Sequence, residues 1–135
     1  MAEAVNLGAH NPDVEIECRF KTARESDTND LLWADGIIFG TPENFGYMAG
    51  ALKDFFDRTF YEVEGQVDGI PYCMFVGAGN DGTSALHSIR RICNGYNFRE
   101  VQDPVLIVGD LSDEDLERCQ ELGLAMAAGL EAGIF

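Results

Sequence analysis

Two loop segments of this sequence carry residue types that could hold a flat heteroaromatic ligand. The first follows an apolar run, Ile37–Phe39, and contains two aromatic side chains, Phe45 and Tyr47. A flat ring needs an aromatic or apolar wall, and small residues such as Gly40 and Gly46 let backbone donors approach it closely. We predict that this segment binds a ring through Thr41, Pro42, Glu43, Asn44, Phe45, Gly46 and Tyr47.

The second segment, Gly77–Gly82, matches the pattern G-x-G-x-x-G between an expected strand and an expected helix. This is the context of a dinucleotide-binding loop, in which an acidic residue further along the chain binds the ribose. Asp110 is the candidate acid, but it lies beyond the usual spacing of about 20 residues. Too little chain follows Asp110 for a complete dinucleotide half-sheet, so the pattern alone does not decide between a dinucleotide and another ligand.

Other catalytic arrangements are not evident. The sequence shows no Ser-His-Asp arrangement, no P-loop and no cluster of metal ligands. The cysteines form no C-x-x-C pair, and each falls inside an expected strand or helix, so neither a disulfide framework nor a zinc site is expected. Buried free thiols in a reducing cytoplasm are the simpler interpretation of Cys18, Cys73, Cys93 and Cys119.

Four segments are expected to form the strands that position the loops. Val14–Phe20 alternates apolar and polar residues, which is typical of a strand with one exposed face near a sheet edge. The other three are continuous apolar runs typical of buried strands: Gly36–Phe39, Ile70–Val76 and Val105–Val108. The first buried strand is expected to stop at a small-residue turn, Gly40–Pro42.

Helical periodicity appears between these strands. Gly50–Val63 has the widest apolar stripe, and Ser112 begins a pattern like a capping box before the last helix. Met1–Ala9 resembles the second half of a helix, Thr83–Tyr96 a full one and Asp30–Asp35 a short turn. Alternation of strands and helices predicts an α/β fold, a parallel sheet with helices on both faces.

Composition indicates one globular domain covering residues 1–135, with 46% apolar and 24% charged residues. The net charge of −15 argues against nucleic acid or an anionic membrane as a partner. No apolar run approaches transmembrane length and no signal-peptide pattern is present, so a cytoplasmic location is expected. The acidity serves either solubility alone or attraction of a basic partner.

The segment Gly36–Tyr61 closely resembles the flavin-ring loop of flavodoxin-like FMN proteins. The resemblance is nearest to the NAD(P)H:quinone reductase branch that includes the tryptophan-repressor-binding protein, and it covers nearly all of the chain. It implies a three-layer flavodoxin-like sandwich that binds FMN, with Ala78, Gly79 and Gly82 across the ring from Thr41–Tyr47.

The resemblance implies hydride transfer from NAD(P)H through flavin to a quinone or similar acceptor. His87, close to the expected site, could donate a proton to a reduced quinone. Two other functions remain open. The chain could be a flavodoxin-type electron carrier that meets a basic redox partner, or a flavin-free scaffold that serves protein interactions, because fold alone does not choose among these functions.

The family's first strand and its phosphate-binding loop have no counterpart after Met1, which already lies in the expected first helix. The strand order 2-1-3-4-5 would leave unpaired edges at Val14–Phe20 and Gly36–Phe39, facing a gap. Loss of the loop is expected to weaken FMN binding severely. Three explanations of the missing strand and loop are open: a truncating start, pairing with a second copy as a homo-oligomer, and loss of the flavin. We expect the first, with the intact gene product binding FMN.

Overall fold

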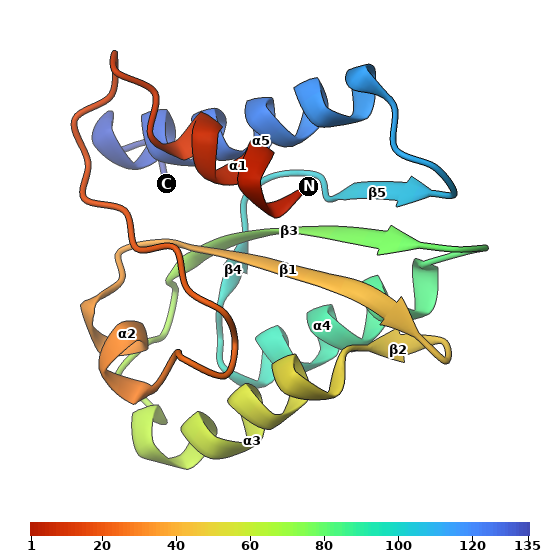
Figure 1. Cartoon of the computed structure of the whole chain (residues 1–135). Helices are drawn as coiled ribbons and strands as arrows, with labels where there is room; N and C mark the ends of the chain where they lie inside the picture. Colours follow the sequence, from red (N-terminus) through yellow and green to blue (C-terminus); the bar gives the residue numbers. More distant parts are fainter.

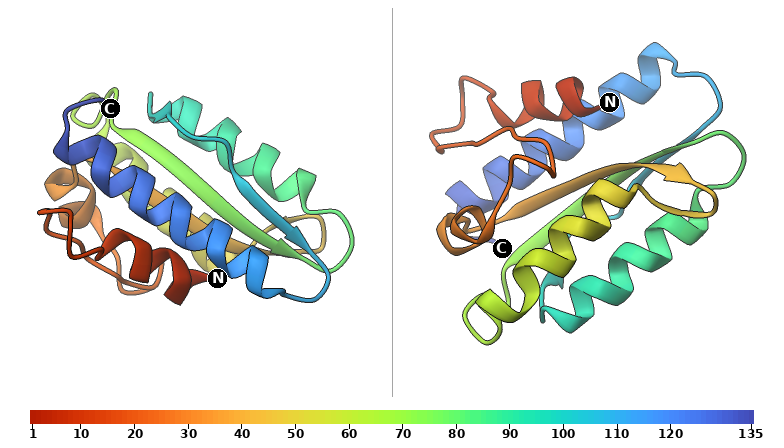
Figure 2. Two further views of the ribbon diagram at one scale, coloured as in Figure 1. Left: turned by 90° about the horizontal axis from the view of Figure 1, so that it is seen from above. Right: turned by 60° about the horizontal axis from the view of Figure 1, so that its bottom comes forward.

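The computed structural model describes all 135 residues as a three-layer α/β sandwich. One face of the sheet is covered by α1 (Ala2–Ala9) and α5 (Asp113–Glu131), which lie side by side in Figures 1 and 2. The other face is covered by α2 (Thr28–Trp33), α3 (Gly50–Val63) and α4 (Thr83–Gly95). The α/β architecture expected from the alternation of elements is confirmed.

The centre of the sheet is parallel. β3 (Pro71–Ala78) pairs with β1 (Ile37–Asn44) on one edge and with β5 (Val105–Val108) on the other. Two short strands complete it: β4 (Arg99–Glu100) runs parallel to the start of β3, and β2 (Tyr47–Met48) runs antiparallel to the end of β1. Neither short strand was expected from the sequence, because a two-residue strand has no periodicity to detect.

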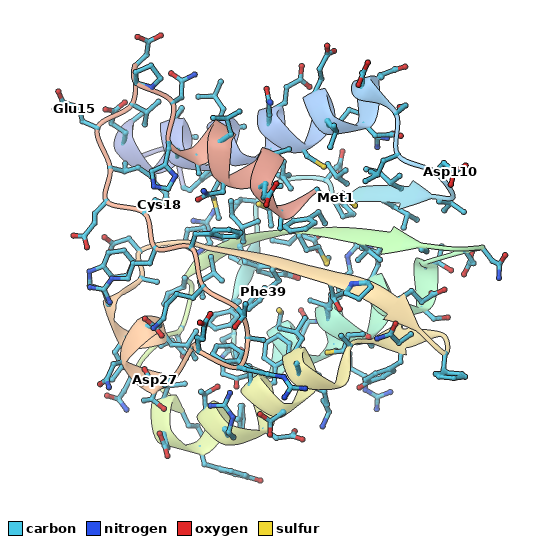
Figure 3. All side chains as sticks on the ribbon, in the orientation of Figure 1. Met1, Glu15, Cys18, Asp27, Phe39 and Asp110 are labelled. Atoms are coloured by element: carbon cyan, nitrogen blue, oxygen red, sulfur yellow. The ribbon has the colours of Figure 1, made fainter.

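The larger hydrophobic core lies on the α3 side of the sheet, below it in Figure 1, and is called the lower core. It forms where the apolar stripe of α3 meets β1 and β3. The stripe predicted for Gly50–Val63 is confirmed, since Leu52, Phe55, Phe56 and Val63 are buried in one cluster. Phe39 points from β1 into this layer in Figure 3, and its ring centroid lies 5.1 Å from that of Phe56. Burial of aromatic rings against the sheet fixes α3 in place.

The upper layer depends on a close contact between α1 and α5. A Cβ built on Gly123 would lie 2.0 Å from the carbonyl oxygen of Val5, and one on Gly8 would lie 2.0 Å from the carbonyl oxygen of Gln120. Both atoms belong to helix backbone, which cannot move aside as a flexible side chain can. The two glycines therefore set the distance between the helices.

We expect Gly123→Ala to lower the free energy of unfolding by about 1–3 kcal/mol, because the new methyl group overpacks the contact between α1 and α5. Gly95→Ala is the matched control: it lies at the end of α4 with nothing within 4 Å of a Cβ. The control should be neutral or stabilising by about 0.5–1 kcal/mol. Urea unfolding measures both, and equal effects of the two substitutions would contradict the close contact.

The expectation of a strand at Val14–Phe20 is wrong. This segment runs extended from α1 past β1 but is not a strand, and residues 15–21 make no hydrogen bond to another backbone group. The backbone N–H of Glu15 instead donates to the Glu131 carboxylate at 2.7 Å. An alternating pattern becomes a strand only where a neighbour supplies a hydrogen-bond ladder, and no strand lies beside this segment.

A cleft of about 1090 Å³ lies between the extended segment and β1. Ile38, Gly40 and Phe75 line its sheet side, and Cys18 and Phe20 line its outer side. β1 pairs with β3 along Ile37–Pro42, and its opposite edge is unpaired until β2 joins it at Glu43. The expectation that the first buried strand has an open edge facing a gap is therefore confirmed.

The expectation of a turn at Gly40–Pro42 is also wrong, because β1 continues through these residues to Asn44. Pro42 pairs in register with Gly77 of β3. A proline has no N–H to offer a second neighbour, so it suits a position where the outer edge of the strand carries no partner. The strand thereby carries the expected ring-binding residues Thr41–Asn44.

We expect this chain to self-associate through the open edge of β1, since unpaired N–H and C=O groups favour pairing with another strand. Light scattering should show a mass that rises with protein concentration. Ile38→Lys, which places a charge in the cleft beside the open edge, should shift the population toward monomer, whereas Leu111→Lys in the loop after β5 should not. A monomer at all concentrations with a cooperative melt would contradict this expectation.

Candidate functional site

Three loops meet at the carboxyl edge of the sheet. Thr41 is in register with Val76 and Pro42 with Gly77, so the loops after β1 and β3 leave the sheet at the same level. The N–H of Gly109, just after β5, donates to the carbonyl oxygen of Ala78 at 2.8 Å. Figure 1 and the right-hand view of Figure 2 both show the three loops at one end of the molecule. This edge is where ligands bind in open α/β sheets.

The first loop is a tight hairpin. Glu43 pairs with Met48 and Asn44 with Tyr47, which leaves Phe45 and Gly46 as the connecting residues. Both have positive φ, 51° at Phe45 and 70° at Gly46, as in a type I′ turn. The turn therefore fixes the backbone from which the side chains at the tip project.

Thr41 holds the base of this hairpin. Its side chain is buried, and its Oγ1 accepts a hydrogen bond from the backbone N–H of Ala49 at 2.9 Å. The same hydroxyl donates to the carbonyl oxygen of Pro42. Both contacts tie the start of α3 to the end of β1, so Thr41 positions the loop as well as lining its base.

Phe45 is the most unusual residue of the site. Its side chain is fully exposed, at 109% of the reference area, and its backbone lies in the left-handed region, which is uncommon for a residue other than glycine. Strain of this kind costs on the order of 1–3 kcal/mol and clusters at ligand-binding positions. With Tyr47 partly exposed beside it, Phe45 offers an aromatic surface for a flat ring.

Glu43 supplies a polar group at the same loop. Its Oε2 atom is buried and has no hydrogen-bond partner. Buried polar atoms are nearly always paired in folded proteins, so an orphan acceptor calls for an explanation. A ring N–H that approaches the hairpin would provide the missing donor.

The second loop combines an open glycine with a packed one. Around Gly79 a Cβ would meet nothing within 4 Å, so its backbone is free for close approach by a ligand. Gly82 is buried at a φ of 80°, and its Cβ would lie 2.3 Å from Cδ1 of Leu106. Gly82 is thus explained by the turn and its packing, and Ala78 is buried at the end of β3, so Gly79 is the exposed one of the three.

In the third loop, the sequence pattern indicates only Asp110 as a candidate. In the structure Leu111 also exposes an apolar side chain here, at 52% of its reference area. The signal that could have identified this loop is the end of the Val105–Val108 strand, since neighbouring parallel strands end at one edge. Figure 3 shows Asp110 at this edge, well away from Cys18.

Thiol and metal chemistry do not fit this edge. Burial raises the pKa of Cys73 and of Cys93 to about 12, so neither is a ready nucleophile. The described chain contains no group of three or more His, Cys, Asp and Glu side chains arranged to hold a metal ion. His87 lies exposed on α4 and has no hydrogen-bond partner. The arrangement is therefore suited to binding a ring more than to covalent catalysis.

None of the helices combines the length and the apolar character needed to cross a membrane.

Known proteins resemble this chain in sequence. The sequence model of the family described as NADPH-dependent FMN reductase matches residues 1–112. A protein named flavodoxin, from Aquifex aeolicus (strain VF5), is 32% identical over 143 residues, covering 94% of this chain and 77% of the relative. An NAD(P)H dehydrogenase (quinone) from Acidithiobacillus ferrooxidans is 51% identical over 39 residues, which are 29% of this chain and 20% of that protein.

Solved structures share the fold. A flavodoxin from the domain Archaea superimposes with a TM-score of 0.79 at 20% identity, covering 95% of this chain and 86% of that one. A flavodoxin, WrbA-like protein from Agrobacterium tumefaciens gives a TM-score of 0.70 at 21% identity, covering 93% and 84%. The flavodoxin-like fold is therefore established for this chain.

We expect Phe45→Asn to raise the free energy of unfolding by about 1 kcal/mol, because asparagine adopts the left-handed conformation of a type I′ turn more readily than phenylalanine. Phe20→Asn removes another exposed ring, at 56% of its reference area, from a position where φ is not positive, so it should give no such gain. Urea unfolding of both variants tests this. A loss of stability in Phe45→Asn would mean that the ring packs against the fold and is not held open.

Proposed function

The chain belongs to the NADPH-dependent FMN reductase family, and on that premise we propose that it binds FMN at the carboxyl edge of its sheet. We further propose that it transfers hydride from NAD(P)H through the flavin to a quinone or a similar acceptor. The observation that carries this proposal is the hairpin tip, where a strained, fully exposed Phe45 lies beside the orphan acceptor of Glu43.

The residues at this edge fit the ring of FMN. The aromatic side chains of Phe45 and Tyr47 would contact its face or edge, and the carboxylate of Glu43 would accept from a ring N–H. Across from them, the backbone of Gly79 is open to close approach. The ring-binding residues proposed for this chain are Thr41, Pro42, Glu43, Asn44, Phe45, Gly46, Tyr47, Ala78, Gly79 and Gly82.

The amino end of α1 is the proposed location of the FMN phosphate, because it lies near the end of β3. Met1 approaches the end of β3, since a Cβ on Gly77 would be 3.2 Å from Sδ of Met1. No side chain caps the first turn of α1, so its backbone N–H groups remain available. Free N–H groups at a helix amino end favour phosphate, although the carboxylate of Glu3 in that turn opposes it.

FMN supplies the electron chemistry when it is bound, because its ring accepts a hydride and passes electrons on. The residues of the chain would orient the ring between the two loops and shield one part of it from water. Thr41 holds the base of the hairpin against the start of α3, because its hydroxyl accepts a hydrogen bond from the N–H of Ala49. No side chain of this edge is required as a nucleophile or a metal ligand.

An electron-carrier role is the second candidate, and the net charge of −15 favours it. A strongly acidic surface attracts a basic redox protein and speeds its association. The relative from Aquifex aeolicus is itself named flavodoxin. An electron carrier would stabilise a one-electron reduced flavin during titration and would not oxidise NAD(P)H.

Titration of the chain with FMN, followed by quenching of flavin fluorescence, tests the proposal. We expect saturable binding, and Phe45→Asn should weaken it by about tenfold, equivalent to about 1.4 kcal/mol, because it removes the aromatic surface at the tip. Phe20→Asn is the control and should bind as the unchanged chain does. The FMN-loaded protein should then oxidise NADPH in the presence of a quinone.

Absence of saturable FMN binding would contradict the proposal and leave the flavin-free scaffold as the better description. FMN binding without NAD(P)H oxidation would support the electron carrier instead. Equal binding by both phenylalanine variants and the unchanged chain would remove the hairpin tip from the site.

A further inference from the structure

A second groove, of about 920 Å³, adjoins the hairpin and runs along the exposed side of α4. It is distinct from the cleft beside β1, with which it shares no lining residue. Its lining residues are Gly46, Tyr47, Lys53, Thr83, Ser84, Leu86, His87, Ser88, Arg90, Arg91 and Ile92.

The charge of this groove is opposite to that of the molecule. The chain has nine lysines and arginines against 24 acidic residues, yet no aspartate or glutamate lines the groove. Lys53, Arg90 and Arg91 line it, together with His87. Since the net charge of −15 repels anions in general, a groove lined only by basic and neutral residues is where an anionic ligand would approach.

Two of the basic groups already have partners outside the groove. Lys53 Nζ lies 2.6 Å from Oδ1 of Asp57, and Arg90 binds both carboxylate oxygens of Glu100, at 2.8 and 2.7 Å. Arg91 makes no ion pair or side-chain hydrogen bond and is exposed. Arg91 is therefore the free cation of the groove.

The spacing along α4 suits an elongated ligand. His87 and Arg91 are four residues apart and so lie on one face of the helix, with the hydroxyls of Thr83 and Ser84 a turn before His87. The helix rises about 12 Å between Thr83 and Arg91. Gly46 and Tyr47 of the hairpin also line the groove, so the groove shares these two residues with the proposed ring site.

We propose that this groove binds the phosphate-bearing adenosine half of NADPH, with Arg91 contacting the 2′-phosphate. The inference rests on the proposed function, because the reactive end of the dinucleotide must reach a ring held at the hairpin. A guanidinium offers paired N–H donors that match the oxygens of a phosphate, and it remains charged at any physiological pH. The hydroxyl of Ser84 is available for the pyrophosphate or the ribose, whereas that of Thr83 already donates to the Asp81 carboxylate.

Calorimetric titration of the chain with 2′,5′-ADP and with 5′-AMP tests the proposal without flavin or turnover. 2′,5′-ADP should bind more tightly than 5′-AMP, which lacks the 2′-phosphate. Arg91→Gln should weaken the binding of 2′,5′-ADP by about tenfold or more, because it removes charge-assisted hydrogen bonds to the 2′-phosphate. It should hardly change the binding of 5′-AMP. Arg24→Gln is the matched control, because Arg24 is exposed, has no ion pair and does not line the groove.

Two results would overturn the proposal: equal binding of the two nucleotides, or equal losses in Arg91→Gln and Arg24→Gln. Thermal melting should show the fold intact in Arg91→Gln, since Arg91 has no partner to lose. If FMN fails to bind while 2′,5′-ADP binding depends on Arg91, the proposed function fails and this inference stands. If FMN-dependent NADPH oxidation proceeds but Arg91→Gln changes the binding of neither nucleotide, the proposed function stands and this inference fails.

Discussion

The pairing of β1 with β3 is the interaction on which the rest of the structure depends. Its register, with Thr41 opposite Val76 and Pro42 opposite Gly77, brings the two loops proposed to bind the ring to the same level. The same pairing carries Phe39 into the lower core, where α3 packs on it. A shift of one residue would turn Phe39 to the opposite face of the sheet and separate the loops.

Stability and binding oppose each other at the hairpin. The buried hydroxyl of Thr41 and the short β2 strand hold Phe45 in a conformation that phenylalanine disfavours and in full contact with water. A turn designed only for stability would use asparagine at this position. The stability of the large aromatic core offsets this conformational strain. A ring that stacks on Phe45 would add favourable contacts and offset part of the strain as well. At the cleft beside β1, by contrast, the outer edge of the strand is left without backbone partners before Glu43.

Local patterns predicted much of the fold, and non-local pairing accounts for the errors. The wide stripe of Gly50–Val63 and the apolar run Val105–Val108 are observed with the expected bounds, because burial of one face follows from their own periodicity. Val14–Phe20 alternates as a strand does but has no neighbour, which its own sequence does not reveal. The residue types of Thr41–Tyr47 indicated a ring-binding segment, and that assignment stays a prediction. The positive φ of Phe45 and the groove beside α4 depend on tertiary contacts and could not be predicted.

The most direct measurement is the change in backbone amide NMR signals on addition of riboflavin, which carries the flavin ring without the phosphate. The account predicts that the largest shifts fall on Phe45, Gly46 and Gly79, at the two loops joined by the register of β1 and β3. Shifts confined to the cleft beside β1, or an absence of saturable shifts at the two loops, would contradict it.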